Sequence, residues 1–201
     1  MTISVGITIG TISEPSGICV AESEERNIPR GQDYGGEEHI LVRRLQRLPP
    51  GTSYPAIVAR TEELISRLES YTDESIRVFI DATGKGEPVV ELFHERITNH
   101  LITQVYFNYG DQLTSAEGGS VINLGKAFLV TRLVTALQSR RLHLPRDRDA
   151  EVLADELNNY QIEIDPDANN RYGAFKVGSH DELVTALGLA AIPPQPMAFL
   201  I

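Results

Sequence analysis

The amino-acid sequence predicts an α/β fold: a mixed β-sheet with antiparallel strands at its N-terminal end and helices flanking it. Strand-like segments follow one another over residues 3–48, and helical and strand-like segments alternate after residue 53. The third observation is segment 78–81 (VFID), a short apolar run of the kind found in strands buried in the middle of a sheet.

The N-terminal strands are predicted from alternation and from turn residues. In segment 3–10 apolar side chains alternate with small ones, so one face packs and the other lets a neighbouring element approach closely. Further strands are expected over 17–22 and 39–48, with a charged, glycine-rich loop over 23–38. Sequential strands with short connections indicate an antiparallel meander.

Helical periodicity and caps predict the later elements. Ser53 suits an N-cap, and Pro55 suits the first turn of the helix that follows it. Segments 108–122 and 142–145 show no usable period. The remaining elements are helices over 55–70, 89–97, from after Asn123 to about Arg140, 150–160 and from Ser179 onward, with strands over 78–81, 104–107, 161–164 and 172–177.

Composition limits the classes of function. With 201 residues and 41% apolar content, the chain is long enough for one large domain or two small ones. We expect one domain over 1–192 and a proline-rich C-terminal tail over 193–201. The formal net charge of −10 excludes a surface that embraces nucleic acid everywhere, so any polyanion contact is local. Cys19 is the only cysteine, which excludes disulfides and cysteine zinc sites, and its apolar neighbours predict a buried side chain.

Neither export nor membrane insertion is expected. The N-terminus has no basic region of the kind that opens a signal peptide, and no apolar run approaches the length of a membrane span. A cytoplasmic setting follows.

Asp81 is the first candidate site residue. A carboxylate at the end of a buried strand is costly to desolvate, so it is usually paired or bound to a metal. We therefore expect Asp81 to form one wall of a divalent-metal site. The glycine-rich segments 82–86 and 125–127 do not fit a phosphate loop, because neither lysine is followed by Ser or Thr, and a tight turn is predicted at Gly84 instead.

Segment 178–183 (GSHDEL) admits two interpretations. Ser179 and Glu182 have the spacing of a capping box, and Asp181 in the first turn would suit the helix dipole. The same acidic side chains could equally serve a functional site.

Four segments, in this order, resemble the C-terminal nuclease domain of tailed-phage large terminase subunits, within the ribonuclease H-like superfamily. They are 5–10 with 14–17; 79–84; 123–126 with the following helix and 142–145; and 180–187. The resemblance implies a metal-dependent endonuclease that cuts concatemeric viral DNA during packaging. It also implies two Mg²⁺ or Mn²⁺ ions, held by acidic residues from the first strand, a central strand and the last helix. Asp81 matches the central-strand aspartate, Asp181 matches the first acid of the last-helix motif, and Glu182 stands where a second aspartate is common.

One position departs from the family pattern. The first-strand aspartate should fall at Thr8, which is neutral. Three outcomes stay open: Glu14 reaches in from the following turn as a metal ligand, the site binds metal weakly, or cleavage has been lost. The alternative to an enzyme is therefore a catalytically inactive module for packaging-motor assembly or DNA docking. A Holliday-junction resolvase is a less favoured alternative, because it lacks the pattern of 180–187.

The resemblance also names partners. They are double-stranded DNA, the terminase ATPase domain, and the portal or small terminase subunit, within the host-cell cytoplasm. Lys126 stands where the family tends to carry a lysine before a helix. Candidate phosphate contacts are Lys85, Lys126, Arg140 and Arg141, and the other dense basic groups are Arg43, Arg44, Arg47, Arg146 and Arg148. Ordinary surface arginines that balance acidic neighbours explain any single one equally well. Whether the chain is an excised domain or a standalone protein stays open.

Overall fold

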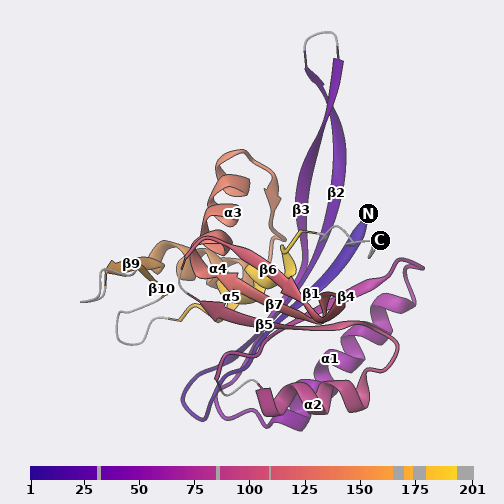
Figure 1. Ribbon diagram of the computed structural model, residues 1–201, viewed down its shortest axis with the longest axis vertical. Helices are drawn as coiled ribbons and strands as arrows, with labels where there is room; N and C mark the ends of the chain where they lie inside the picture. Colours follow the sequence, from indigo (N-terminus) through magenta and orange to yellow (C-terminus); the bar gives the residue numbers. More distant parts are fainter. Residues whose placement is uncertain (31–32, 85–86, 109, 165–169, 174–179, 194–201) are drawn as a thin grey trace.

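The computed structural model describes residues 1–30, 33–84, 87–108, 110–164, 170–173 and 180–193. Among these residues, eight strands form one mixed sheet in the order β6-β7-β5-β4-β1-β2-β3-β8 (Figure 1). The strands are β1 (Thr2–Thr8), β2 (Ser16–Arg30), β3 (Asp33–Leu48), β4 (Ile76–Asp81), β5 (Ile102–Asn108), β6 (Leu113–Ala116), β7 (Val121–Gly125) and β8 (Leu142–His143). A separate pair is formed by β9 (Gln161–Ile164) and β10 (Asn170–Gly173).

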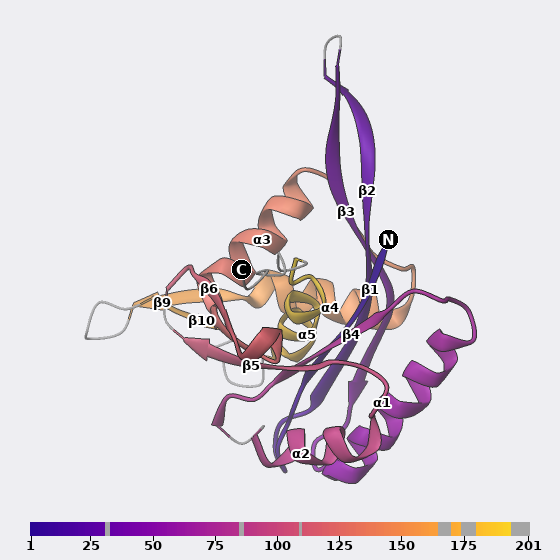
Figure 2. The same cartoon turned by 45° about the vertical axis from the view of Figure 1, so that its right-hand side comes forward.

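Helices cover both faces of the sheet. They are α1 (Tyr54–Glu69), α2 (Glu87–Arg96), α3 (Lys126–Gln138), α4 (Arg148–Asn159) and α5 (Glu182–Ala190). Helices α1 and α2 pack on one face, whereas α3, α4 and α5 pack on the other (Figure 1, Figure 2). The predicted meander is confirmed, since β1 with β2 and β2 with β3 pair antiparallel, while β1, β4, β5 and β7 pair in parallel. None of the helices in the described part is long and apolar enough to cross a membrane.

The two faces of β1 differ as the alternation predicts. Ile3, Val5 and Ile7 join the core under α1 and α2. On the opposite face, α5 lies so close to the strand that a Cβ on Gly6 would stand 2.1 Å from the carbonyl oxygen of Ala186. Every residue of α5 is buried, so this short helix is an interior element seated on small side chains. Cys19, from the neighbouring strand, is fully buried as expected, and burial raises the pKa of its thiol.

The prediction of a loop over 23–38 is wrong. Strands β2 and β3 continue through this segment with paired register, for example Glu24 opposite His39, and the hairpin stands clear of the rest of the molecule (Figure 2). Much of the projecting ribbon is exposed on both sides, so its charged side chains carry no apolar alternation from which a strand could be predicted.

Several boundaries also differ. Segment 108–122 contains β6 and the start of β7, so Asn123 lies in a strand and α3 begins only at Lys126, while 142–143 form β8. Helix α5 begins at Glu182 rather than at Ser179, which lies outside the described residues together with 174–178. Ser53 is the N-cap of α1, but its side chain bonds no amide in the described structure. The tail beyond Pro193 is likewise outside that part, and the division at 192 stays a prediction.

Candidate metal centre

A cavity of about 230 Å³ opens where the carboxyl ends of β1 and β4 meet the first residues of α5. The register explains the meeting: Ile7 pairs with Ile80 in parallel, so Thr8 and Asp81 leave the sheet at the same edge. The polar and charged side chains that line the cavity are Thr8, Glu14, Asp81, Lys126, His180, Asp181, Glu182 and Thr185. The structure thus brings all four predicted acidic residues to one opening, although they come from distant parts of the chain.

Asp81 is held by the turn that follows it. The amide of Thr83 donates to Asp81 Oδ1 at 2.9 Å, and the amide of Phe107 in β5 donates to Thr83 Oγ1 at 2.9 Å, which ties the turn to the neighbouring strand. Burial raises the pKa of Asp81, the bonds from Thr83 and the ammonium of Lys126 lower it, and the nearby Asp181 carboxylate raises it.

Asp181 and Glu182 enter the cavity from the start of α5. Asp181 is the N-cap residue, and Glu182 is the first residue of the helix, with 9% of its surface exposed. Glu182 Oε1 lies 3.1 Å from Nδ1 of His180. Glu182 Oε2 is buried and accepts no hydrogen bond from any described residue, while Nη2 of Arg47 stands 3.6 Å away. Burial is the main reason that the pKa of Glu182 is raised.

Thr8 stands at the edge of the cavity with its hydroxyl already engaged. The amide of Gly17 donates to Thr8 Oγ1 at 2.8 Å, and this oxygen lies 3.4 Å from the carbonyl oxygen of Glu182. The hydroxyl therefore links β1, β2 and α5 and supplies no charge. Glu14, in the exposed turn after β1, lines the same cavity and accepts from Thr11 Oγ1 at 3.2 Å. Of the carboxylates that line the cavity, Glu14 is the nearest in sequence to Thr8, the position at which the expected aspartate is replaced by a neutral residue.

Comparison with known proteins identifies the architecture. No protein-family model and no curated protein sequence matches the chain. Solved structures do match: the large terminase nuclease of thermophilic phage G20c has a TM-score of 0.62 and 18% identity, covering 94% of this chain and 80% of that one. A mutant nuclease domain of the large terminase subunit of bacterial virus Sf6 has a TM-score of 0.65 and 13% identity, covering 97% and 90%. The human cytomegalovirus terminase nuclease domain has a TM-score of 0.54 and 14% identity, covering 93% and 80%.

The chain has the fold of a terminase nuclease domain. The predicted ribonuclease H-like architecture is thereby confirmed over nearly the whole chain. At 18% and 13% identity, the comparisons show a shared fold. The roles of individual side chains stay predictions. Crystal structures of the G20c nuclease with bound magnesium and of the SPP1 nuclease domain with bound manganese show divalent ions in those two proteins.

The cavity can be tested against the ions that the terminase nuclease fold implies. Four carboxylates supply hard oxygen donors, which Mg²⁺ and Mn²⁺ prefer, and Glu182 Oε2 is a buried acceptor without a donor. In the described part, however, no three His, Cys, Asp or Glu side chains lie close enough to form a ready metal cluster. The donors therefore fit a divalent ion in chemistry, although among the described residues no three of them gather around one point as they stand.

Sequence reasoning missed Glu156, next to the site, and considered its partner Arg47 only as one of several basic residues. Glu156, on α4, is 4% exposed; its Oε2 accepts from the amides of Leu183 at 2.8 Å and Val184 at 3.0 Å, and its Oε1 pairs with Arg47. Burial raises the pKa of Glu156 to about 7 against the bonds and charge that lower it. The signal was present: Glu156 falls between Leu153 and the next apolar residue of the helical stripe, where a charge is buried and must find a partner.

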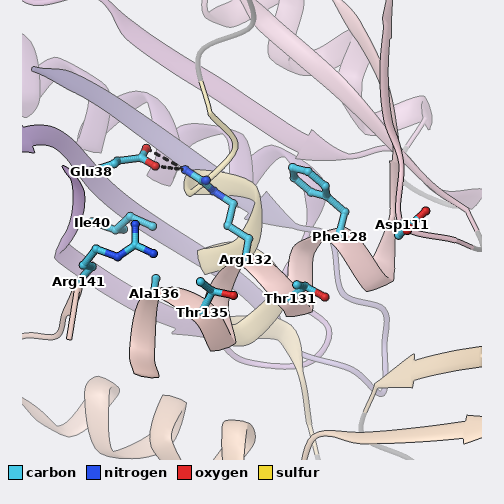
Figure 3. A pocket seen from close by; sticks show the side chains of 9 residues that line it. All are labelled: Glu38, Ile40, Asp111, Phe128, Thr131, Arg132, Thr135, Ala136 and Arg141. Carbon is cyan, nitrogen blue, oxygen red and sulfur yellow. Dashed lines mark hydrogen bonds and ion pairs between the residues drawn. The ribbon is translucent and has the colours of Figure 1, made fainter. Parts of the chain in front are cut away.

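The predicted DNA contacts do not form one group. Lys126 lines the acidic cavity, and its Nζ lies 5.4 Å from the ring centroid of Phe107. Arg141 instead lines a separate cavity of about 340 Å³ between α3 and β3, where Arg132 pairs with Glu38 (Figure 3). Arg140 is exposed, with a left-handed φ of 56°, and Lys85 lies outside the described residues.

Proposed function

We propose that this chain is a divalent-metal-dependent endonuclease that hydrolyses DNA phosphodiester bonds during viral genome packaging. The observation that carries the proposal is the meeting of Asp81 and Asp181 at one cavity, at the strand ends of a terminase nuclease fold. Two carboxylates from such distant segments, with two more beside them, concentrate negative charge that a bound cation would neutralise.

In this proposal Asp81, Asp181 and Glu182 hold Mg²⁺ or Mn²⁺, and Glu14 completes the set from the β1 side. The bound ions would activate a water molecule and stabilise the leaving oxygen. The amide of Thr83 fixes the Asp81 carboxylate, so its two oxygens are already ordered before the substrate binds. Lys126, across the cavity, offers a positive charge to a phosphate that enters beside the acids.

The substrate follows from the same proposal. Double-stranded DNA would reach the cavity through local positive charge, with Lys126 as the first contact and Lys85, Arg140 and Arg141 as outer candidates. A net charge of −10 makes such contacts few and salt-sensitive. The terminase ATPase domain, and the portal or small terminase subunit, are the protein partners that we infer, in the host-cell cytoplasm.

Thr8 favours a second candidate function. Its hydroxyl is bound to Gly17, and no acid stands at the end of β1. A protein that kept this fold for motor assembly or DNA docking, without cleavage, would need no charge there.

A plasmid-nicking assay distinguishes the nuclease from the non-cleaving docking module. Wild type is assayed with Mn²⁺ and with EDTA, beside Asp81→Ala, Asp181→Ala and the control Asp155→Ala, an exposed residue of α4. The nuclease proposal expects Mn²⁺-dependent nicking that Asp155→Ala keeps and the other two variants lose. Nicking that survives in Asp81→Ala removes that residue from the mechanism. A wild type that shifts DNA in a gel without nicking it supports the docking module.

A further inference from the structure

Helix α5 is a short buried helix whose two ends are held by charged side chains from other elements. At its C-terminal end, Arg132 Nε donates to the carbonyl of Ala191 at 2.5 Å, and Arg77 Nη2 donates to that of Ile192 at 3.0 Å. Cations near the last carbonyls of a helix complement its dipole. These two bonds therefore hold the residues that follow the last turn of α5, at the opposite end of the helix from Asp181 and Glu182.

The N-terminal end is held differently. A helix begins with amides that have no partner inside it, and a buried start must find acceptors elsewhere. The N-cap residue, Asp181, supplies no side-chain bond to the described amides. Glu156 does so instead from α4, since its Oε2 accepts from both Leu183 and Val184. This acceptor frees the Asp181 carboxylate to face the cavity.

Arg47 connects the cap to the cavity. From β3, its Nη2 pairs with Glu156 Oε1 and stands 3.6 Å from Glu182 Oε2. The guanidinium thus lies between the carboxylate that caps the helix and the carboxylate that enters the cavity. Because Glu156 is buried and bound on both oxygens, it has little freedom to move, and the first turn of α5 has little freedom to rotate.

We propose that Glu156, tethered by Arg47, is a positioning residue: it fixes the first turn of α5 so that Asp181 and Glu182 face Asp81. This inference rests on the proposed function, because positioning matters only where the three carboxylates share a ligand. Two amides that immediately follow Glu182 are bound to one oxygen, so a shift of that oxygen moves the backbone that carries both acids. Glu156 touches neither metal nor DNA in this scheme.

The test uses Mn²⁺ affinity, measured by titration calorimetry and by the EPR signal of free Mn²⁺, without DNA. Glu156→Asp keeps the charge but withdraws the carboxylate by one methylene, whereas Glu156→Gln keeps the reach and an acceptor oxygen without the charge. The matched control is Asp147→Ala, which removes the N-cap bond to Ala150 at the opposite end of α4. Asp81→Asn reports whether the binding measured is at the proposed site.

Positioning predicts that Glu156→Asp weakens Mn²⁺ binding at least fivefold. Glu156→Gln, which keeps an acceptor for the two amides but loses the pairing with Arg47, should weaken it less, and Asp147→Ala should stay within threefold of wild type. Amide exchange of Leu183 and Val184, measured in EDTA, should be faster in Glu156→Asp than in wild type. Unchanged affinity in Glu156→Asp overturns the inference, and a loss confined to Glu156→Gln would instead indicate a charge effect. Equal losses in the two variants also overturn the inference, because Glu156→Gln keeps the reach of the side chain. A wild type whose Mn²⁺ affinity matches that of Asp81→Asn overturns the proposed function itself, and the inference falls with it.

Discussion

Thr8→Asp is the substitution that most clearly separates a weakened metal site from a lost one. Thr8 is 6% exposed, and its hydroxyl accepts from the amide of Gly17 while lying 3.4 Å from the carbonyl oxygen of Glu182. An aspartate can keep the bond from Gly17, but its carboxylate would also face that carbonyl oxygen and the acids of the cavity. The new charge is therefore poorly compensated unless a cation binds.

The size of the effect follows from this environment. A buried acceptor left without a donor costs about 1–3 kcal/mol, and more when it is charged. We expect Thr8→Asp to lower the free energy of unfolding in EDTA by about 2–3 kcal/mol. Mn²⁺ at about 100 times its Kd stabilises the native state by about 2.7 kcal/mol, which would offset that loss. We also expect Mn²⁺ to bind the variant at least tenfold more tightly than wild type.

The assay is urea unfolding in EDTA and in Mn²⁺, with calorimetry for the affinity and Thr8→Asn as the control of similar shape without charge. We expect Mn²⁺ to restore the stability of the aspartate variant and not that of the asparagine variant. If the aspartate variant binds Mn²⁺ no more tightly than the asparagine variant, position 8 lies outside the metal site and the family comparison fails there.

Two further predictions follow from the same region. Gly6→Ala places a Cβ 2.1 Å from the Ala186 carbonyl oxygen and 2.6 Å from the Ala190 amide nitrogen. Because both atoms belong to the helix backbone, the free energy of unfolding, measured by urea titration, should fall by about 3 kcal/mol. A loss below about 1 kcal/mol would contradict the close packing of α5 on β1. Carboxylates bind metal only when deprotonated, and burial raises the pKa of Asp81 and of Glu182, so Mn²⁺ affinity should rise over a range of pH that lies above the one in which an ordinary carboxylate titrates. A flat calorimetric profile over that range would show that neither group titrates on binding.

The sequence predicts the fold because local pattern and tertiary role agree over the central strands. The alternation of apolar and small side chains around Gly6 predicts the core face of β1 and the close approach of another element on the opposite face, where the structure has α5. The apolar run that ends at Asp81 likewise predicts a buried strand with an acid at its end, and the structure has both.

Other features depend on partners that are distant in the chain. The projecting part of the β2–β3 hairpin is formed by backbone pairing between its two strands, as between Arg26 and Glu37, and has no apolar face. The cap on α5 comes from Glu156, whose target amides begin 27 residues further along, so no capping pattern near the helix could reveal it. Local motifs therefore located the acids, and tertiary contacts decide how they are held.

The most direct measurement is a crystal soaked in Mn²⁺, with the ion located by its anomalous signal. We predict a peak coordinated by carboxylate oxygens of both Asp81 and Asp181, and its loss in Asp81→Asn crystals soaked in the same way. A soaked crystal whose cavity holds no peak, or in which Mn²⁺ binds elsewhere and leaves these two side chains without an ion, would contradict the shared site on which the nuclease proposal depends.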